Sequence, residues 1–296
     1  IYVGLEYKKI GSFARSHYLD GYFSAFHSSV SFDNRVDFFI QSPLYAEIGG
    51  SANFYNFFRS NYGLLQRGTD VNYSKHRDHY LTVAAGFPSS RHSVVNLRFN
   101  AGQNEYLYFE QPSHDENDEM DRTRFRYTGV KLEYERKNMD YALYPTSGIH
   151  QQISAIFVNG KERFIPGDEL LADGWADRRW FGGKASREQY FRKWTRWFSL
   201  GYLAEGVITD RPDFLNDYAT HISSPAFQPT PHSRIVHLKE FRANKYLAAE
   251  LMPIFHFGPH FYLKTNGYVF APGNYDHLYA TLRRRRRSLF EPLLAS

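Results

Sequence analysis

Hydrophobic and polar residues alternate with a period of two along most of this chain. In the segment YTGVKLEYERK, residues 127–137, aliphatic and aromatic side chains occupy one set of alternate positions, and charged side chains occupy most of the other set. Because successive side chains of a strand point to opposite faces, this segment predicts a strand with one apolar and one charged face. The same alternation recurs in further segments: residues 36–40, 81–87, 95–101, 153–157 and 247–251. The pattern therefore predicts an all-β protein built from two-faced strands.

A two-faced sheet fits either a soluble sandwich, whose apolar face is buried, or a membrane barrel, whose apolar face meets lipid. The lengths of the connections favour the barrel. Short turns are expected at Asp33–Asn34, Pro88–Arg91 and Gly258–Pro259, and long polar connections around or after Glu105, Lys161 and Thr209. Short and long connections mostly alternate along about fourteen strands, as in outer-membrane barrels, which have short turns at one rim and longer loops at the other.

We therefore expect one domain, residues 1–296, that forms a transmembrane antiparallel up-and-down β-barrel in the outer membrane of a Gram-negative bacterium. Residues 189–208 are expected to form one long strand, with Trp194 and Trp197 in an aromatic girdle at the membrane surface. A soluble all-β binding domain remains the alternative if the apolar rows face a protein core.

Composition agrees with a barrel. Aromatic residues make up 18% of the chain, and no run approaches the roughly 18 consecutive apolar residues that a spanning helix needs, which excludes a helical membrane protein. The mean hydropathy of -0.55 is compatible with a barrel, because only alternate residues of each strand touch lipid. Cysteine is absent, which excludes disulfides and thiolate metal sites.

In a barrel, the charged face of each strand turns toward the lumen. The lumen-facing candidates are Arg98, Lys131, Glu133, Glu135, Glu250 and Lys264. Such residues either form a salt-bridge network that fills the lumen or line a polar passage for a solute or a polypeptide. The sequence leaves both interpretations open.

The segment DYALYPTSGIHQQISAIFVNG, residues 140–160, resembles a strand-turn-strand of barrels in the bacterial surface antigen superfamily, which includes the outer-membrane assembly factors. Its turn motif consists of Tyr144, Pro145, Thr146 and Gly148. The segments PAFQPTPHS, residues 225–233, and EFRANKYLAAELMPIF, residues 240–255, are similar to the C-terminal barrel of Bacteroidetes-type patatin-like phospholipases. The matching strand motif consists of Phe241, Arg242, Ala243 and Asn244.

This resemblance implies a barrel of about sixteen strands that follows a patatin-type serine lipase domain on the same polypeptide. The chain departs from the superfamily at two points. Its long loop before residue 245 lacks the Arg-Gly-aromatic motif of assembly and translocation members, and the chain stops at EPLLAS instead of a terminal aromatic residue. We therefore expect the closing C-terminal strands to be missing from these 296 residues.

The expected function is a membrane anchor or translocation module for the upstream lipase domain, and an assembly-factor or secretion-type barrel is the alternative. We expect no catalysis by this chain, because it contains no G-x-S-x-G nucleophile elbow. Clusters at Lys75–His79 and Asp115–Asp121 are interpreted as solvated loops, because neither has the spacing of a metal site, so no metal or cofactor is expected.

Five consecutive arginines near the C-terminus are the remaining candidates for binding. They are Arg283, Arg284, Arg285, Arg286 and Arg287. By strand parity the run falls in an outside loop, where it would contact solvent or the phosphates of lipopolysaccharide. Aromatic platforms for single-stranded nucleic acid do not accompany the run, so the expected partners are outer-membrane lipids and lipopolysaccharide, with no nucleic acid.

Overall fold

The computed structural model describes residues 1–10, 13–24, 27–38, 44–58, 73–109, 119–140, 145–167, 173–191, 195, 197–228, 239–257 and 261–273. Its strands are β1 Tyr2–Ile10, β2 Ala14–Phe23, β3 His27–Phe38, β4 Leu44–Phe58, β5 Tyr73–Ser90, β6 Ser93–Tyr108, β7 Asp121–Met139, β8 Gly148–Ile165, β9 Gly174–Tyr190, β10 Phe198–Thr209, β11 Lys245–His256, β12 Tyr262–Lys264 and β13 Gly267–Pro272. The helix α1, Asp217–Ser223, and a 3₁₀ helix, Lys239–Phe241, lie between β10 and β11.

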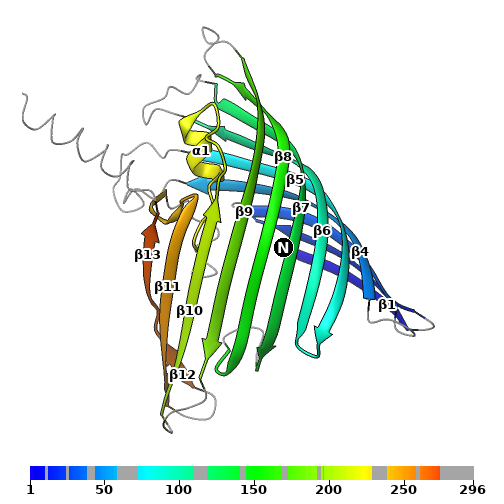
Figure 1. Ribbon diagram of the computed structural model, residues 1–296, viewed down its shortest axis with the longest axis vertical. Helices are drawn as coiled ribbons and strands as arrows, with labels where there is room; N and C mark the ends of the chain where they lie inside the picture. The colour runs from blue at the N-terminus through cyan, green and yellow to red at the C-terminus, as the bar shows by residue number, and fades with distance from the viewer. Residues whose placement is uncertain are drawn as a thin grey trace, which may run out of the picture.

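The strands form one antiparallel sheet in which each strand pairs with the next in the sequence from β1 to β12. This up-and-down order confirms the predicted fold class. The sheet twists and curves into a wall that surrounds a concave side, and α1 lies on that side (Figure 1). In the described part of the chain, the first strand, β1, pairs on one side only, with β2.

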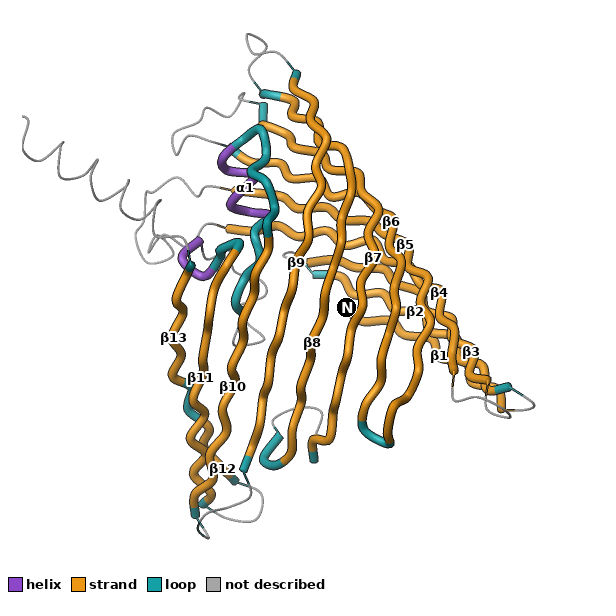
Figure 2. The backbone as a smooth tube through the Cα atoms, viewed as in Figure 1, coloured by secondary structure: helices purple, strands orange, loops and turns teal. Residues whose placement is uncertain are grey.

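The central strands are longer than a membrane requires. Strands β4 to β9 contain between 15 and 19 residues each. A tilted strand crosses a bilayer with about 9–11 residues, so each of these strands exceeds that length. Figure 2 shows these strands running without interruption across the wall. No helix in the residues described above is long and apolar enough to cross a membrane.

Strands β12 and β13 are two parts of one strand position. Ile254 pairs with Lys264 and Leu251 pairs with Gly267, so both parts continue one register along β11. Between them, the backbone N–H of Thr265 donates to the carbonyl oxygen of Pro253 at 3.0 Å. Proline has no N–H to return that hydrogen bond, which explains the break in the ladder. The thirteen described strands therefore occupy twelve positions along the wall, compared with the fourteen or so expected.

The two faces of the wall differ as the alternation predicted. On β7, the side chains of Val130 and Leu132 are 40% and 53% exposed on the convex face, whereas that of Glu133 is 4% exposed on the concave face. Side chains on the convex face are apolar through the middle of the wall. Those on the concave face are mostly polar.

The hairpin predicted at Pro88–Arg91 is confirmed, but its turn lies at residues 91–92, because β5 continues to Ser90 and β6 begins at Ser93. The turn predicted at Asp33–Asn34 is wrong, because both residues pair with β4 inside β3. Asp33 faces the polar concave side, and Oδ1 of Asn34 lies 2.5 Å from Nδ1 of His17 on β2. These polar surroundings accommodate residues that would otherwise favour a turn. Gly258–Pro259 lies outside the described residues.

The prediction of one strand across residues 189–208 is also wrong. β9 ends at Tyr190 and β10 begins at Phe198, and the two strands pair as an antiparallel hairpin. The intervening sequence has no Gly, Pro, Asn or Asp to mark a turn. The sequence pattern therefore gave no sign that one strand ends here and another begins. Trp197 is exposed, as an aromatic at the membrane surface would be, and Trp194 lies outside the described residues.

Candidate functional site

The concave face carries a polar network that spans β4, β6, β7 and β8. Lys131 forms an ion pair with Glu133, and Nε2 of Gln152 donates to the same carboxylate at 2.7 Å. Arg98 lies directly opposite Lys131, and its Nη2 is 4.0 Å from a carboxylate oxygen of Glu47. Because Glu133 is almost fully buried, these hydrogen bonds replace the water that its carboxylate loses.

The network continues toward the rim with the short turns. Glu135 accepts from Nε2 of His150 at 3.0 Å, if that nitrogen carries the proton. On the other side of Arg98, the hydroxyl of Tyr45 donates to Oδ1 of Asn96, and Arg35 lies 3.6 Å from the centroid of the Tyr45 ring. The cation is well placed over the aromatic face, which is an attractive arrangement. Polar groups on this part of the wall therefore satisfy one another in large part, although Nε of Arg98 is buried without a hydrogen-bond partner among the described residues.

A second polar group lies near the other end of the sheet. Nζ of Lys264 donates to the hydroxyl of Tyr190 at 2.7 Å, and that hydroxyl donates to Glu188 at 2.6 Å. Glu250 is buried and accepts from Nδ2 of Asn266 at 2.5 Å. All six candidates for the lumen lie on the concave face, in two separate groups. Whether they fill the lumen or line a passage stays a prediction.

The connection after β10 folds back onto the concave face (Figures 1 and 2). Its residues Phe214, Tyr218, Ala219 and Ile222 pack against an aromatic and aliphatic cluster on the inner side of β6, β7 and β8. That cluster comprises Tyr106, Tyr108, Phe125 and Val158. We call residues 210–228 the fold-back segment. Sequence periodicity missed its helix because α1 has only seven residues, fewer than two complete turns.

Polar contacts cap the start of α1 and attach it to the wall. The side chain of Asn216 accepts from the N–H of Tyr218 at 2.8 Å and so caps the first turn of α1. Just before the cap, the N–H of Leu215 donates to Glu162 of β8 at 2.7 Å. Nε of Arg178 donates to the other carboxylate oxygen of Glu162 at 2.7 Å. The carboxylate of Glu162 is 0% exposed, so this contact is a buried attachment point.

Two arginines hold the C-terminal end of α1. Nη2 of Arg211 donates to the carbonyl oxygen of Thr220 at 2.7 Å, and Nη1 of Arg242 donates to that of Ser224 at 2.9 Å. Carbonyl groups at the end of a helix lack intrahelical partners, and their partial negative charge favours cations. Burial lowers the pKa of both guanidinium groups from its usual value. Arginine starts so high that both stay protonated at neutral pH.

The motif residues Phe241 to Asn244 do not form a strand, contrary to the prediction. Phe241 ends the 3₁₀ helix, and Arg242 makes an isolated bridge with Ala226 before β11 begins. Nδ2 of Asn244 donates to the carbonyl oxygen of Arg211 at 3.3 Å. The motif closes the fold-back segment instead of contributing to the sheet, because its side chains bind the carbonyl groups of that segment.

The described residues of the predicted turn motif follow β7 and lead into β8, whose first residue is Gly148. Asp140 accepts from the backbone N–H and the hydroxyl of Thr146, at 2.9 Å and 2.6 Å. Gly148 has φ +114, and a Cβ there would lie 2.0 Å from the carbonyl oxygen of Asn138. Only glycine fits this close approach and this backbone conformation. Pro145 precedes the bonded Thr146, and Tyr144 lies outside the described residues.

The other charged clusters singled out in the sequence either lie in a strand instead of a loop or fall outside the described residues. Lys75–His79 lies inside β5 and not in a loop, so the expectation of a solvated loop there is wrong. Alternate residues of this stretch face opposite sides, and His76 stacks on Tyr106 at 4.6 Å between ring centroids. Among the residues that the structure describes, no group of His, Asp or Glu is arranged to hold a metal ion. Residues 283–287, and 115–118 of the acidic stretch, lie outside that part of the chain.

The convex face carries a continuous apolar band. Cross-strand neighbours form one row through five adjacent strands, β5 to β9: Val83, Phe99, Val130, Phe157 and Phe181. Further exposed apolar side chains flank this row, among them Leu81, Leu97, Leu132, Ile153 and Leu247. In the described part of the chain, no second sheet and no helix covers the band. So large an exposed apolar area marks a surface that contacts something other than water.

Comparison with known proteins identifies a fold but not a family. BamA from Haemophilus ducreyi, in a structure lacking POTRA domains 1-3, resembles this chain with a TM-score of 0.54 and 11% sequence identity over 95% of the chain. The similar part covers 59% of that BamA chain, so this chain spans a little more than half of its length. No protein-family model and no curated protein matches the sequence. The chain therefore has the fold of an outer-membrane β-barrel.

Proposed function

We propose that this chain spans the outer membrane of a Gram-negative bacterium and anchors a patatin-like phospholipase domain that precedes it on the same polypeptide. The observation that carries the membrane assignment is the apolar band on the convex face, opposite a polar concave face. This distribution is the inverse of a soluble protein and is typical of a membrane barrel.

The height of the band agrees with a bilayer. On the convex side of β7, Arg136 and Arg126 are the nearest cations below and above the apolar residues. They are ten positions apart, which corresponds to ~34 Å along the strand and ~24 Å of height at a tilt of ~45°. The outward apolar band of outer-membrane barrels is about 25 Å tall. The two arginines therefore bracket a hydrocarbon layer.

The anchoring role is supported by the resemblance of residues 140–160 and 225–255 to the barrels of patatin-like phospholipases. The fold-back segment also supports it. This segment is attached to the wall by Glu162, and Arg211 and Arg242 hold the C-terminal end of its helix. The connection also lacks the Arg-Gly-aromatic motif of assembly and translocation members. In this proposal the wall makes no covalent chemistry, and the lipase domain supplies the nucleophilic serine.

The anchoring role is tested by fractionating cells that express the full-length protein, with and without residues 1–296. We expect the intact protein and its lipase activity in the outer-membrane fraction, and the truncated protein in a soluble fraction. A full-length sequence without a G-x-S-x-G elbow before Ile1 would contradict the role as a lipase anchor. Lipase activity that stays in the membrane fraction after residues 1–296 are removed would also contradict this role.

An assembly-factor or secretion-type barrel is the second candidate. The fold shared with BamA and the fold-back segment on the concave face favour it. This candidate predicts tandem POTRA domains before Ile1 instead of a lipase domain. It also predicts that deleting the gene lowers the amounts of other barrels in the outer membrane, which quantitative proteomics of membrane fractions measures. Unchanged amounts of the other barrels would exclude the assembly role.

A soluble all-β binding domain is the third candidate, and the exposed apolar band counts against it. Purification separates this candidate from both membrane candidates. A membrane barrel needs detergent and migrates faster on a gel before boiling than after it, because the folded barrel resists denaturation. A protein that is monomeric without detergent would exclude both membrane candidates.

A further inference from the structure

The convex face changes from apolar to cationic at one rim of the wall. Toward that rim, the outward positions of β7 continue from Val130 and Thr128 to Arg126, Arg124 and Arg122. Cations also follow the apolar row on the neighbouring strands, at Arg77 on β5, Lys161 and Arg163 on β8, and Arg179 on β9. This rim is opposite the short β5–β6 turn.

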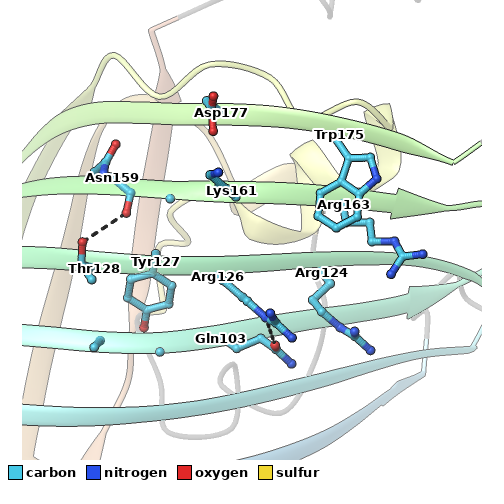
Figure 3. Close-up of a pocket in the computed structure, with 13 residues that line it drawn as sticks. Gln103, Arg124, Arg126, Tyr127, Thr128, Asn159, Lys161, Arg163, Trp175 and Asp177 are labelled. Carbon is cyan, nitrogen blue, oxygen red and sulfur yellow. Dashed lines mark hydrogen bonds between the residues drawn. The ribbon is translucent and has the colours of Figure 1, made fainter.

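Four of these cations line a groove of about 610 Å³ between β6 and β9. Figure 3 shows Arg124, Arg126, Lys161 and Arg163 around this groove, with Trp175 at one side. Asp177 is the one carboxylate among its lining residues. Small side chains at the apolar border, such as those of Ala101 and Thr128, leave the space open. The groove is therefore both hollow and cationic.

Like charges face each other across the strands in this groove. Arg126 lies directly opposite Lys161, and Arg124 lies directly opposite Arg163. Directly opposed like charges destabilise a sheet unless something between them carries the opposite charge. Two such pairs in succession indicate that the groove is adapted to an anion.

The neighbouring carboxylates neutralise this group only in part. Glu105 lies 3.0 Å from Arg124, but it is also shared with Arg77 at 3.4 Å and Arg122 at 3.8 Å. Asp173 lies 2.7 Å from Arg163. Asp177 is the cross-strand neighbour of Lys161 on β9. In the described part of the chain, however, no carboxylate forms an ion pair within 4.0 Å of Arg126 or Lys161. Nε of Arg126 donates to the neutral side chain of Gln103 at 2.9 Å.

We propose that this groove binds the phosphate groups of an anionic glycolipid, the lipopolysaccharide of the outer leaflet. The inference rests on the membrane location proposed above. The position of the groove supports the proposed binding, because its cations lie immediately beyond the apolar band, at the height where charged headgroups meet hydrocarbon. Guanidinium and ammonium groups bind phosphate through charge-assisted hydrogen bonds.

The difference between the two rims of the convex face indicates how the wall is oriented in the membrane. At the opposite rim, the outward cations of β7 and β9 are Arg136 and Arg187, and both have the neutral Gln151 of β8 as a cross-strand neighbour. The cationic rim would therefore face outward, toward the leaflet that contains lipopolysaccharide. The exposed indole of Trp175, 65% accessible, offers an apolar face beside the cations for a sugar ring of the headgroup.

The proposal is tested by binding of purified protein in detergent to bisphosphorylated lipopolysaccharide and to the same lipid after enzymatic dephosphorylation. In the double variant Arg126→Gln/Lys161→Gln, each lost charge-assisted contact is expected to weaken binding about tenfold, or about a hundredfold in total. The matched control is Arg136→Gln, which removes one exposed cation from the other rim of the same strand and is expected to bind like the wild type.

A charge-preserving exchange, Arg126→Lys/Lys161→Arg, distinguishes lost charge from disturbed folding. We expect it to retain most of the binding, with heat-modifiable gel mobility like that of the wild type. Loss of binding as complete as in the double glutamine variant would show that charge is not the determinant. Equal binding of the dephosphorylated lipid, or wild-type binding by the double glutamine variant, would also overturn the proposal.

Competition identifies the source of the phosphate. We expect lipopolysaccharide bound to the wild type to resist inorganic phosphate at equal concentration, because the acyl chains of the lipid contact the apolar band below the groove. Displacement by equimolar inorganic phosphate would overturn the lipid assignment. Heat-modifiable mobility and insertion into vesicles are measured independently of lipopolysaccharide binding. The proposed binding by the groove can therefore be refuted while the proposed membrane-spanning function is retained. A chain that does not insert into vesicles contradicts the proposed function itself.

Discussion

Substitution of Leu132 by arginine tests whether the convex face meets hydrocarbon. Leu132 is exposed on β7 between its cross-strand neighbours Leu97 and Ala155. It lies four positions from Arg136 and six from Arg126, which correspond to ~10 Å and ~14 Å of height. The side chain is therefore close to the middle of the proposed hydrocarbon layer.

At that depth, an arginine on the lipid face should lower the free energy of unfolding by about 2–4 kcal/mol. Thr128→Arg is the matched control, because this outward position lies next to the cationic rim, where the expected cost is about 0–1 kcal/mol. On a soluble protein, an exposed leucine replaced by arginine would change the stability by no more than about 0.5 kcal/mol.

The assay is reversible denaturant unfolding in phospholipid vesicles, followed by tryptophan fluorescence. The chain contains 4 tryptophans, and the two substitutions leave all of them in place. We expect a clear difference in the free energy of unfolding between Leu132→Arg and Thr128→Arg. Equal and small changes in both variants would refute the reasoning, because depth in a bilayer would then have no effect.

Three further predictions concern the fold-back segment and one turn. Glu162→Gln should expose residues 210–228 to limited proteolysis, because it weakens a buried acceptor of two hydrogen bonds; unchanged cleavage would contradict this role. Arg242→Ala should lower the free energy of unfolding by about 1–3 kcal/mol, because it leaves carbonyl groups at the end of α1 unpaired, and chemical denaturation measures that loss. Gly148→Ala should be more destabilising than the control Gly267→Ala, because only Gly148 has a positive φ and a backbone oxygen in the place of its Cβ.

The fold class could be predicted from the sequence because strand alternation is a local property. In residues 127–137, each side chain indicates its own face, and the structure places Val130 and Lys131 on opposite faces as expected. The turn at residues 91–92 was also visible, since PSSR combines residues that favour turns.

The grouping of the concave polar residues could not be predicted in the same way. Lys264 reaches Tyr190 across a sequence separation of 74 residues, and that contact depends on the register of every strand pair between them. Periodicity indicates which face of the sheet a side chain lies on, but it does not indicate which residues of other strands lie next to it. The partners Glu47, Gln152 and Tyr190 were therefore missed, although each is polar and occupies a position whose side chain faces the concave side of its strand.

The misplaced elements have related causes. Turn-prone Asp33 lies within β3 because the inner face of this sheet is polar, and Asn34 lies on the opposite face, where it contacts His17. The hairpin near residue 195 has no turn residues to mark it, and α1 is too short for a helical period. In the first case the polar inner face of the sheet overrides a local turn signal, and in the other two the sequence carries no local signal.

The cationic groove had a signal in the sequence. Arg122, Arg124 and Arg126 share the parity of Val130 and Leu132, so the alternation assigns three arginines in succession to the apolar face. A row of like charges on the face that meets lipid marks the level at which the hydrocarbon ends. Its pairing with Lys161 and Arg163 emerged only with the register of β7 against β8.

The contact between the convex face and hydrocarbon can be measured directly with spin labels. The chain has no cysteine, so Leu132→Cys and Lys131→Cys each provide a unique site on opposite faces of one strand. With nitroxide labels in reconstituted vesicles, we expect residue 132 to be accessible to dissolved oxygen and protected from an aqueous nickel reagent. Residue 131 should show a lower ratio of oxygen to nickel accessibility. Equal ratios at the two positions, or strong nickel accessibility at residue 132, would contradict the account.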